Sequence, residues 1–413
     1  MENYNYSKLS MSQIRDQERD AFERKVDELD GKFPPANIII AGKTGVGKST
    51  LLNAVFKEKL AETGIGRPVT PNCEKYESDS VPIKIWDTVG FELDEAGSQH
   101  KKVIKDIRDI IAKKNANDDP FDKIHCIWYC VNAEAKRFED IESKFVTDLY
   151  RIGVPFVIVM TQCFSKKQND TFQTYIEEQL KKTGGEDIPV IQLLALEKEI
   201  EFDDEIKVVK AKGLKELVDF TVDSMPGYLK NSFIAAQKVD QDCKRKAGAD
   251  VVSEYVKKAI EENFVRNIIG IRLILTNIDT QKMLSRIAYL YNIRILKPKN
   301  IEQICHDSIR AVEKGGLQNF WKFESKIKDE FDQLTSEMNF NKDDFSFEDL
   351  NSPQANRSAY LLALYGFKFM NAVETVWETA TQEQLEHIDT VVALLTSEMN
   401  RHLDSKNEIT KRR

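Results

Sequence analysis

The first half of the chain alternates between short apolar runs and stretches in which apolar residues recur every three or four positions. An amphipathic stretch at residues 8–30 precedes them. The short runs predict buried strands, and the spaced stretches predict helices with one apolar face. The predicted strands begin at Ile38 and at residues 74, 82, 124, 155 and 190, and the predicted helices lie after the first strand and near residues 103–111, 138–150, 170–183 and 214–224. Strands interleaved with helices predict an α/β fold whose mostly parallel sheet is flanked by helices.

The second half has a different pattern. Beyond Pro226-Gly227 only helical spacing is found, and no strand is predicted as far as the C-terminus. The predicted helices lie at residues 228–246, 249–264, 266–292, 300–313, 317–338, 356–379 and 381–404. We therefore expect an N-terminal amphipathic helix within residues 1–33, an α/β domain at 34–226 and a separate all-α helical domain at 227–413.

Composition supports a globular protein of more than one domain. The 413 residues are 41% hydrophobic and 31% charged, and the formal net charge is −8. An acidic chain of this kind argues against an indiscriminate nucleic-acid binder, and no nucleic-acid partner is evident. Six cysteines without framework spacing predict free thiols in a reducing compartment. With no signal peptide and no uninterrupted apolar run long enough to cross a bilayer, we expect a cytoplasmic protein without a transmembrane segment.

The first predicted strand runs directly into a glycine-rich loop, GKTGVGKS, that has the spacing G-x-x-x-x-G-K-[ST]. Glycines allow the backbone to turn tightly and aim its N–H groups at phosphate oxygens, and the following helix adds partial positive charge. Lys48 is expected to reach the β- and γ-phosphates, and the Ser49 hydroxyl to hold Mg²⁺. The residues predicted to contact the nucleotide here are Gly42, Lys43, Thr44, Gly45, Val46, Gly47, Lys48, Ser49 and Thr50.

A second motif, Asp87-Thr88-Val89-Gly90, follows about forty residues later at the end of a predicted strand. It has the D-x-x-G pattern, in which the carboxylate contacts Mg²⁺ through water and the glycine amide faces the γ-phosphate. The pattern alone is a weak signal. Its position after a phosphate loop and an apolar strand makes Asp87 and Gly90 candidate site residues.

These motifs and the strand order resemble a translation-factor-type P-loop GTPase domain. Among such domains, residues 34–226 are similar to the septin, immunity-associated and immunity-related GTPases. The resemblance implies GTP or GDP as ligand and Mg²⁺ held by Ser49, Thr70 and Asp87. Thr70 matches the loop threonine that senses the γ-phosphate in such GTPases, and Thr63 is the weaker candidate. The loop that carries both, residues 61–72, is rich in Gly and Pro and is predicted to have no regular structure.

The chain departs from the family pattern where the base is read. The family motif [NT]-K-x-D ends in an aspartate that binds guanine, whereas this chain has Thr161-Gln162-Cys163-Phe164. Either Asp170 replaces that aspartate, or Thr161 and Gln162 hold the base together with backbone near Ala195. The resemblance implies selectivity for guanine, and this departure from the family motif weakens that expectation.

A second departure concerns hydrolysis. Many switch GTPases place a water-orienting glutamine after D-x-x-G, and this chain has Phe91 there. Arg67 lies three residues before Thr70, as the built-in arginine does in heterotrimeric G-protein α-subunits. It could neutralise charge on the transferring phosphoryl group, or it could be an exposed arginine without a catalytic part. The candidate catalytic residues are Lys48, Thr70, Gly90 and Arg67.

Three hypotheses follow for function. The first is a slow, Mg²⁺-dependent GTPase whose nucleotide state controls homodimer formation or partner binding through the helical domain. The second is a pseudo-GTPase scaffold that holds nucleotide structurally, and the third is an ATP-using member. The helical half faintly resembles a helical domain of some bacterial GTPases that can associate with membranes, so peripheral membrane contact stays open. Its apolar runs are interrupted at Arg286, Lys368 and Asn371, which favours a soluble bundle.

Overall fold

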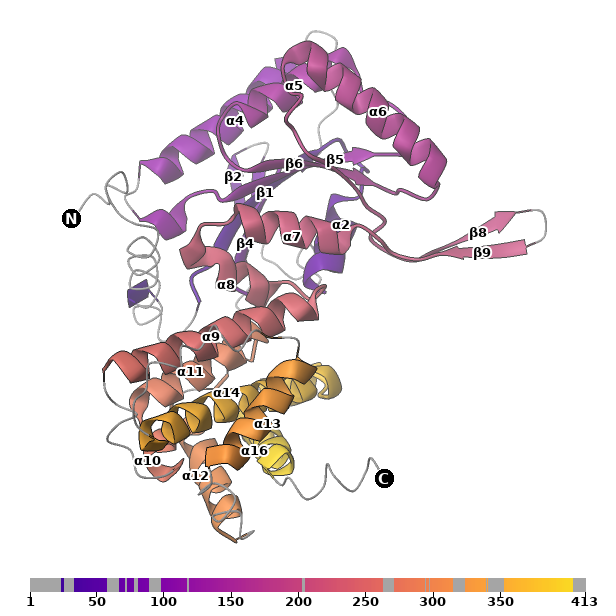
Figure 1. Ribbon diagram of the computed structural model, residues 1–413. Coiled ribbons are helices and arrows are strands. Elements are labelled where there is room, and N and C mark those ends of the chain that lie inside the picture. The colour runs from indigo at the N-terminus through magenta and orange to yellow at the C-terminus, as the bar shows by residue number, and fades with distance from the viewer. Residues whose placement is uncertain are drawn as a thin grey trace. The chain divides into compact units, whose positions relative to one another are not determined.

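The computed structural model describes residues 24–25, 33–57, 67–70, 73–77, 81–88, 98–116, 119–202, 205–262, 271–293, 295–296, 298–314, 324–338, 340 and 353–403. These residues fall into two compact units, Met1–Asp240 and Gln241–Arg413. The first unit contains all the strands of the described part of the chain, and the second unit is helical there (Figure 1).

A seven-stranded sheet forms the centre of the first unit, in the order β2-β3-β4-β1-β5-β6-β7. The strands are β1 (Ala36–Gly42), β2 (Arg67–Thr70), β3 (Cys73–Glu77), β4 (Ile83–Thr88), β5 (Cys126–Asn132), β6 (Phe156–Thr161) and β7 (Val190–Gln192). Strands β4, β1, β5, β6 and β7 are parallel, and β2 and β3 pair antiparallel at one edge. The predicted α/β fold with a mostly parallel sheet is confirmed.

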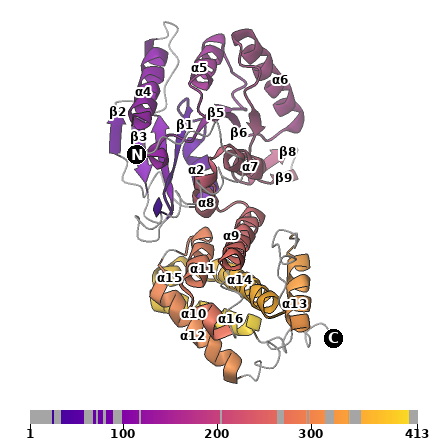
Figure 2. The same cartoon turned by 60° about the vertical axis from the view of Figure 1, so that its left-hand side comes forward.

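Helices cover both faces of this sheet, as Figures 1 and 2 show. One face carries α4 (Ser98–Asn115), α5 (Asp140–Tyr150) and α6 (Lys166–Thr183), and the other carries α2 (Lys48–Phe56), α7 (Leu214–Ser224) and α8 (Gly227–Ala236). Because successive strand residues point to opposite faces, β5 serves both layers. Ile127 joins the apolar cluster under α4, α5 and α6, whereas Trp128 stacks on Phe56 of α2 at a centroid distance of 6.3 Å. The sheet therefore separates two apolar layers.

Two strand regions differ from the sequence prediction. The loop predicted at residues 61–72 contains β2, which pairs with β3 and has an irregular register between Pro68 and Thr70. Pairing with a neighbouring strand outweighs the Gly and Pro content there. A separate hairpin, β8 (Lys198–Phe202) and β9 (Glu205–Val209), was not predicted at all. Its charged and apolar residues alternate, which is a pattern typical of a strand.

The helical unit contains, in its described part, α9 (Gln241–Glu261), α10 (Ile271–Thr276), α11 (Ile278–Leu290), α12 (Pro298–Lys314), α13 (Glu324–Glu337), α14 (Pro353–Thr379), α15 (Gln382–Glu386) and α16 (Ile388–Leu403). The predicted all-α character is confirmed. The helix predicted at residues 266–292 is divided because Asn277 caps α11, its side chain accepting from the backbone N–H groups of Asp279 and Thr280. The break predicted near residue 248 lies inside α9.

The boundary between the units differs from the one expected at residue 226. Helix α8 packs on the sheet of the first unit, where Phe233 meets Trp128 edge-on at 6.3 Å, and the compact units divide after Asp240. The predicted N-terminal helix at residues 8–30 lies mostly outside the described residues. Of its described residues, Lys25 forms an ion pair with Asp119 at 2.8 Å. Within the described part of the chain, no helix combines the length and apolarity that a bilayer crossing requires.

Candidate functional site

The glycine-rich loop turns sharply between β1 and α2. Gly42 has φ of +145°, and a Cβ there would lie 2.5 Å from the Cys130 carbonyl oxygen, so this position requires glycine. Gly45 and Gly47 are left-handed, with φ of +76° and +97°. Helix α2 then begins at Lys48 without a side-chain cap or an acidic residue in its first turn, as far as the described residues show. Its first N–H groups are therefore available to an anion.

Lys48 is held over this loop. Its side chain is only 9% exposed, and Nζ donates to the Gly42 carbonyl at 3.1 Å. Thr44, Ser49 and Thr50 are exposed at the mouth of the loop and at the start of α2. The structure thus brings the predicted phosphate-contacting residues together around one helix N-terminus.

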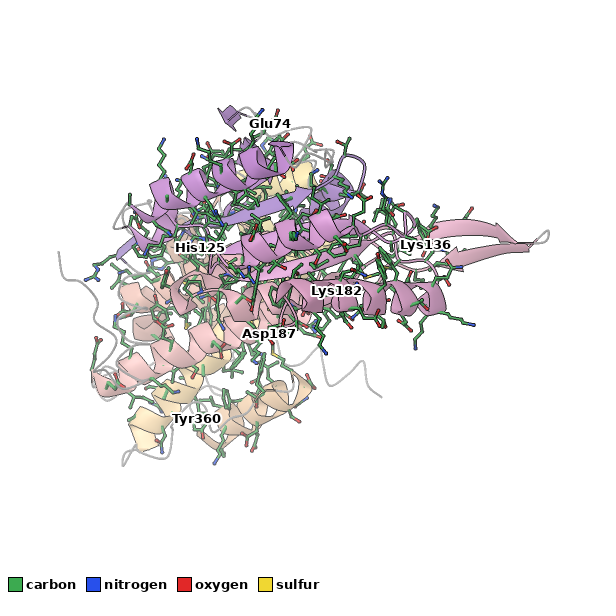
Figure 3. The ribbon with its side chains drawn as sticks, turned by 90° about the horizontal axis from the view of Figure 1, so that it is seen from above. Glu74, His125, Lys136, Lys182, Asp187 and Tyr360 are labelled. Atoms are coloured by element: carbon green, nitrogen blue, oxygen red, sulfur yellow. The ribbon has the colours of Figure 1, made fainter. Side chains whose placement is uncertain are left out.

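Asp87 lies beside this loop because β4 and β1 are parallel neighbours with Ile40 opposite Asp87. Its Oδ1 is buried and has no hydrogen-bond partner among the described residues. Burial raises the pKa of Asp87 to about 6; the positive charge of Lys48 opposes this shift, and Glu74 adds to it. Glu74 is labelled in Figure 3. An unsatisfied carboxylate oxygen facing a lysine fits a hydrated Mg²⁺ ion, which prefers oxygen ligands and keeps several waters.

The residues after β6 form the other end of the candidate site. The Thr161 hydroxyl donates to the Val46 carbonyl of the loop at 2.5 Å. Gln162 follows in a left-handed conformation, with φ of +57°. The bond from Cys163 N to Leu193 O, 3.1 Å long, brings this turn beside the segment that leads to Ala195. Thr161 and Gln162 therefore lie on the turn next to the segment that contains Ala195, and their contact with a base stays a prediction.

The position of the missing base-reading aspartate is occupied by an aromatic ring. Lys198 Nζ lies 4.2 Å from the centroid of the Phe164 ring, which is a cation–π contact. Asp170, the proposed replacement, lies on α6, where its carboxylate accepts from Gln192 Nε2 at 2.9 Å. This partner within the fold gives the carboxylate a structural role.

Several predicted residues cannot be placed in full. Arg67 and Thr70 belong to β2, in which Thr70 pairs with Cys73, and only their backbone is described. Gly90, Phe91 and Thr63 lie outside the described residues. Their roles stay predictions.

One charged group at the loop, Glu142 on α5, was not predicted from the sequence. Its Oε2 forms an ion pair with Lys43 Nζ at 2.6 Å, and its Oε1 accepts from the Tyr129 hydroxyl at 3.0 Å. A signal was present in the sequence, because Glu142 lies at helical spacing from the apolar residues Phe145, Val146 and Leu149, all of which are buried. Ser143 and Thr147 are buried on the same helix.

Comparison with known proteins assigns this fold. Residues 37–162 match the protein-family model described as "50S ribosome-binding GTPase", so this part of the chain is a P-loop GTPase domain. Among curated proteins the chain is similar to septins, in agreement with the sequence resemblance. It is 23% identical to human septin-9 over 215 residues, which are 45% of this chain and 34% of that protein. It is also 23% identical to neuronal-specific septin-3 of Danio rerio, covering 45% of this chain and 55% of the septin.

Two solved structures align with part of the chain. A probable GTP-binding protein engB aligns with a TM-score of 0.33 and 20% identity, covering 46% of this chain and 98% of that one. A dimerization-deficient mutant of Toc33 from Arabidopsis thaliana aligns with a TM-score of 0.33 and 15% identity, covering 54% of this chain and 96% of that one. This chain spans about a third to about half of the length of the septins above.

Proposed function

We propose that the chain is a slow, Mg²⁺-dependent GTPase whose nucleotide state controls homodimer formation or the binding of a protein partner. One observation carries the proposal: the open N-terminus of α2 faces the same space as the buried Lys48 and the unsatisfied Asp87 carboxylate. Such an arrangement suits a phosphate chain and its metal ion.

The proposed hydrolysis is an in-line attack of water on the γ-phosphate. The loop amides and Lys48 would neutralise charge on the phosphoryl oxygens, and the amide of Gly90 is proposed to contact the γ-phosphate. Ser49, Thr70 and Asp87 would hold Mg²⁺, and the bound ion would supply positive charge that offsets the negative charge of the phosphates. Arg67 adds positive charge to the transferring group. We infer a slow reaction because Phe91 cannot orient water as a glutamine does.

Guanine nucleotide is the proposed ligand, with reduced discrimination against adenine. Phe164 offers no carboxylate to the guanine N1 and N2 groups, and Asp170 has a partner in Gln192. Base contacts then rest on Thr161, Gln162 and backbone near Ala195. A buried polar group that reads one base can discriminate by orders of magnitude, so its loss lowers the preference for GTP. Competition of GTP and ATP for a fluorescent analogue measures this preference.

Self-association is the process that the nucleotide state is proposed to control. A GTPase domain without its own water-orienting glutamine needs a group from elsewhere, and a second copy facing the nucleotide would supply it. A non-hydrolysable GTP analogue should then raise the dimer fraction over GDP, and turnover per molecule should rise with protein concentration. Light scattering in both nucleotide states decides this point. Equal mass and flat specific activity would instead favour a separate activating partner.

The domain arrangement and location belong to the same proposal. We infer a nucleotide-binding domain joined to a helical domain that changes partner or packing with nucleotide state. A cytoplasmic location is supported by the six free cysteines, of which all but Cys243 are buried. Thiols of this kind are typical of a reducing compartment.

The alternative is a pseudo-GTPase scaffold that binds nucleotide without turning it over. Phe91 and Phe164 motivate it, because each replaces a polar group of the family pattern. A phosphate-release assay on purified protein separates the two functions. Sustained turnover that Lys48→Ala abolishes supports the GTPase, and tight nucleotide binding without phosphate release supports the scaffold. Identification of the nucleotide that remains bound after gentle purification tests the ligand class directly.

A further inference from the structure

We propose that Glu142, assisted by Tyr129, is a positioning residue for the phosphate loop and acts through Lys43. The inference rests on the proposed nucleotide site and adds to it a group that no motif predicts. Lys43 is the second residue of the loop, Tyr129 lies on β5 and Glu142 lies on α5, so the cluster ties three separate elements together. The Lys43–Glu142 ion pair is 2.6 Å long, and Tyr129 donates to the second carboxylate oxygen at 3.0 Å.

The cost of burying this carboxylate indicates that it has a task. Glu142 is 2% exposed, and burial raises its pKa, although the hydrogen bonds from Lys43 and Tyr129 lower it. An apolar residue of similar size would stabilise the fold at least as well, because desolvating an ion pair offsets much of its attraction. Glu142 is the only charged residue among the buried ones of α5, a helix that the structure describes in full. The other buried residues of this helix are Phe145, Val146, Leu149 and the uncharged polar Ser143 and Thr147. An apolar side chain could neither pair with the Lys43 ammonium nor accept from the Tyr129 hydroxyl, and only the first of these contacts reaches the loop.

The loop needs such an anchor because its glycines permit many backbone conformations. Thr161 fixes one limb by its hydrogen bond to the Val46 carbonyl. Lys43 begins the other limb, and its carbonyl accepts from Val46 N at 3.4 Å. Between the two anchors, Gly45 has no atom within 4 Å of a built Cβ among the described residues. Holding both limbs presets the loop amides for phosphate and lowers the ordering cost of binding.

The Lys43–Glu142 ion pair lies beside a cavity next to the phosphate loop. This cavity, of about 110 Å³, is lined by loop residues together with the segment between β5 and α5. Lys136, labelled in Figure 3, belongs to that segment and has a left-handed backbone, with φ of +47°. Arg137 in the same segment pairs with Glu139 at 2.7 Å, so this second ion pair uses neither Lys43 nor Glu142. The negative charge of Glu139 adds to the raised pKa of Glu142, so Arg137 and Glu139 stay unchanged in the test below.

The test is a double-mutant cycle on the full chain. In each variant, calorimetric titration measures the affinity for GDP in the presence of Mg²⁺. Glu142→Gln keeps the shape and an acceptor for Tyr129 but removes the charge, and we expect affinity for GDP to fall about 10-fold. Lys43→Gln should cause a similar loss. If Glu142 acts through Lys43, the double variant should be no weaker than either single one. Additive losses, or unchanged affinity in folded Glu142→Gln, overturn the inference.

A milder pair of variants keeps the test decisive should Glu142→Gln fail to fold. Tyr129→Phe removes the hydroxyl that contacts Glu142. Tyr150→Phe removes a hydroxyl at the end of α5, the helix that carries Glu142. We expect Tyr129→Phe to weaken GDP binding about 3-fold and Tyr150→Phe to leave it unchanged. Equal effects of the two overturn the positioning role. Failure of the wild-type chain to bind any nucleotide would overturn the proposed function itself, which is a distinguishable result.

Discussion

The two units place their charged groups differently. In the first unit the core layers beside the sheet are apolar, and the ionic groups Lys43, Lys48 and Asp87 gather at the carboxyl edge of the strands. In the helical unit, lysines are buried between helices. Lys244 is 1% exposed and donates to the Leu290 carbonyl at 2.7 Å, and Lys368 is 5% exposed and contacts both Glu330 and the His402 carbonyl.

The difference lies in how helix ends are satisfied. An α-helix leaves backbone groups unpaired at both ends. Leu290 is the last residue of α11 and His402 lies in the last turn of α16, so buried lysines satisfy carbonyls at two C-termini. At α2 the N–H groups of the first turn have no such side-chain partner within the described residues. Helix ends whose backbone groups are hydrogen-bonded stabilise the fold. A helix end whose backbone groups have no partner, beside a buried lysine, indicates a ligand site.

The largest expected effect is on stability in the helical unit. Lys368→Met leaves Glu330 and the His402 carbonyl without their cation, and we expect the free energy of unfolding to fall by about 3 kcal/mol. Urea unfolding followed by circular dichroism measures this loss. Lys328→Met, the same change at an exposed position of α13, should stay within about 0.5 kcal/mol of wild type. A change in nucleotide affinity caused by Lys368→Met would break the comparison.

The next effect is on ligand binding in the first unit. Lys48→Ala removes a charge-assisted contact to phosphate, and we expect affinity for Mg²⁺ and GTP to fall about 100-fold. Calorimetric titration measures the affinity, and thermal unfolding without nucleotide should change little. Lys144→Ala, at an exposed position of α5, is the matched control. Undiminished affinity in Lys48→Ala would mean that the open helix end does not hold phosphate.

Without Mg²⁺ and nucleotide, the buried Asp87 carboxylate should lower the free energy of unfolding. Its folded-state pKa is raised from 3.8 to about 6, so the folded protein binds this proton more tightly than the unfolded chain does. In the nucleotide-free protein, the contribution of Asp87 to the free energy of unfolding therefore rises as pH falls from about 6 to about 4. At pH 7 the buried, charged carboxylate lowers that free energy by its full amount. We expect Asp87→Asn to raise the free energy of unfolding at pH 7 by roughly 1–3 kcal/mol.

The same variant should lose Mg²⁺-dependent nucleotide binding, because an amide replaces the carboxylate. Urea unfolding at pH 7 and at pH 4.5 provides the control, since the advantage of Asp87→Asn should shrink at the lower pH. An advantage of equal size at both values would contradict the assignment of this destabilisation to the carboxylate.

The smallest effect concerns helix packing. Gly248 of α9 faces Met370 of α14, and a Cβ at Gly248 would collide with the Met370 sulfur. We expect Gly248→Ala to lower the free energy of unfolding by about 1 kcal/mol, since methionine can partly move aside. Introducing Met370→Ala as well should remove the collision, so that Gly248→Ala costs less in that background. Strict additivity of the two changes would show that the contact is not tight.

Much of the first unit could be predicted because its strands are short apolar runs and its loop has a motif set by phosphate chemistry. β2 and the β8–β9 hairpin escaped prediction because pairing between strands, which composition does not show, stabilises them. The start of α11 depends on one capping side chain, Asn277, which divides the long helix that was predicted there. Glu142 was missed because a single carboxylate among apolar positions is ordinarily solvated, and only the fold places a lysine opposite it.

The tryptophans give each unit its own optical reporter. Trp86 directly precedes Asp87, and its ring has Lys75 and Lys114 ammonium groups 5.7 and 5.2 Å from the centroid. Trp377, in the helical unit, packs edge-on against Tyr291 at 6.0 Å. Charges close to an indole shift its emission, so intrinsic fluorescence from Trp86 should follow metal and nucleotide at Asp87. Trp128 and Trp321 emit as well, so the signal of one indole is obtained by difference. Wild type minus Trp86→Phe gives the signal that follows the ligand, and wild type minus Trp377→Phe gives the signal that follows helical packing, without any label.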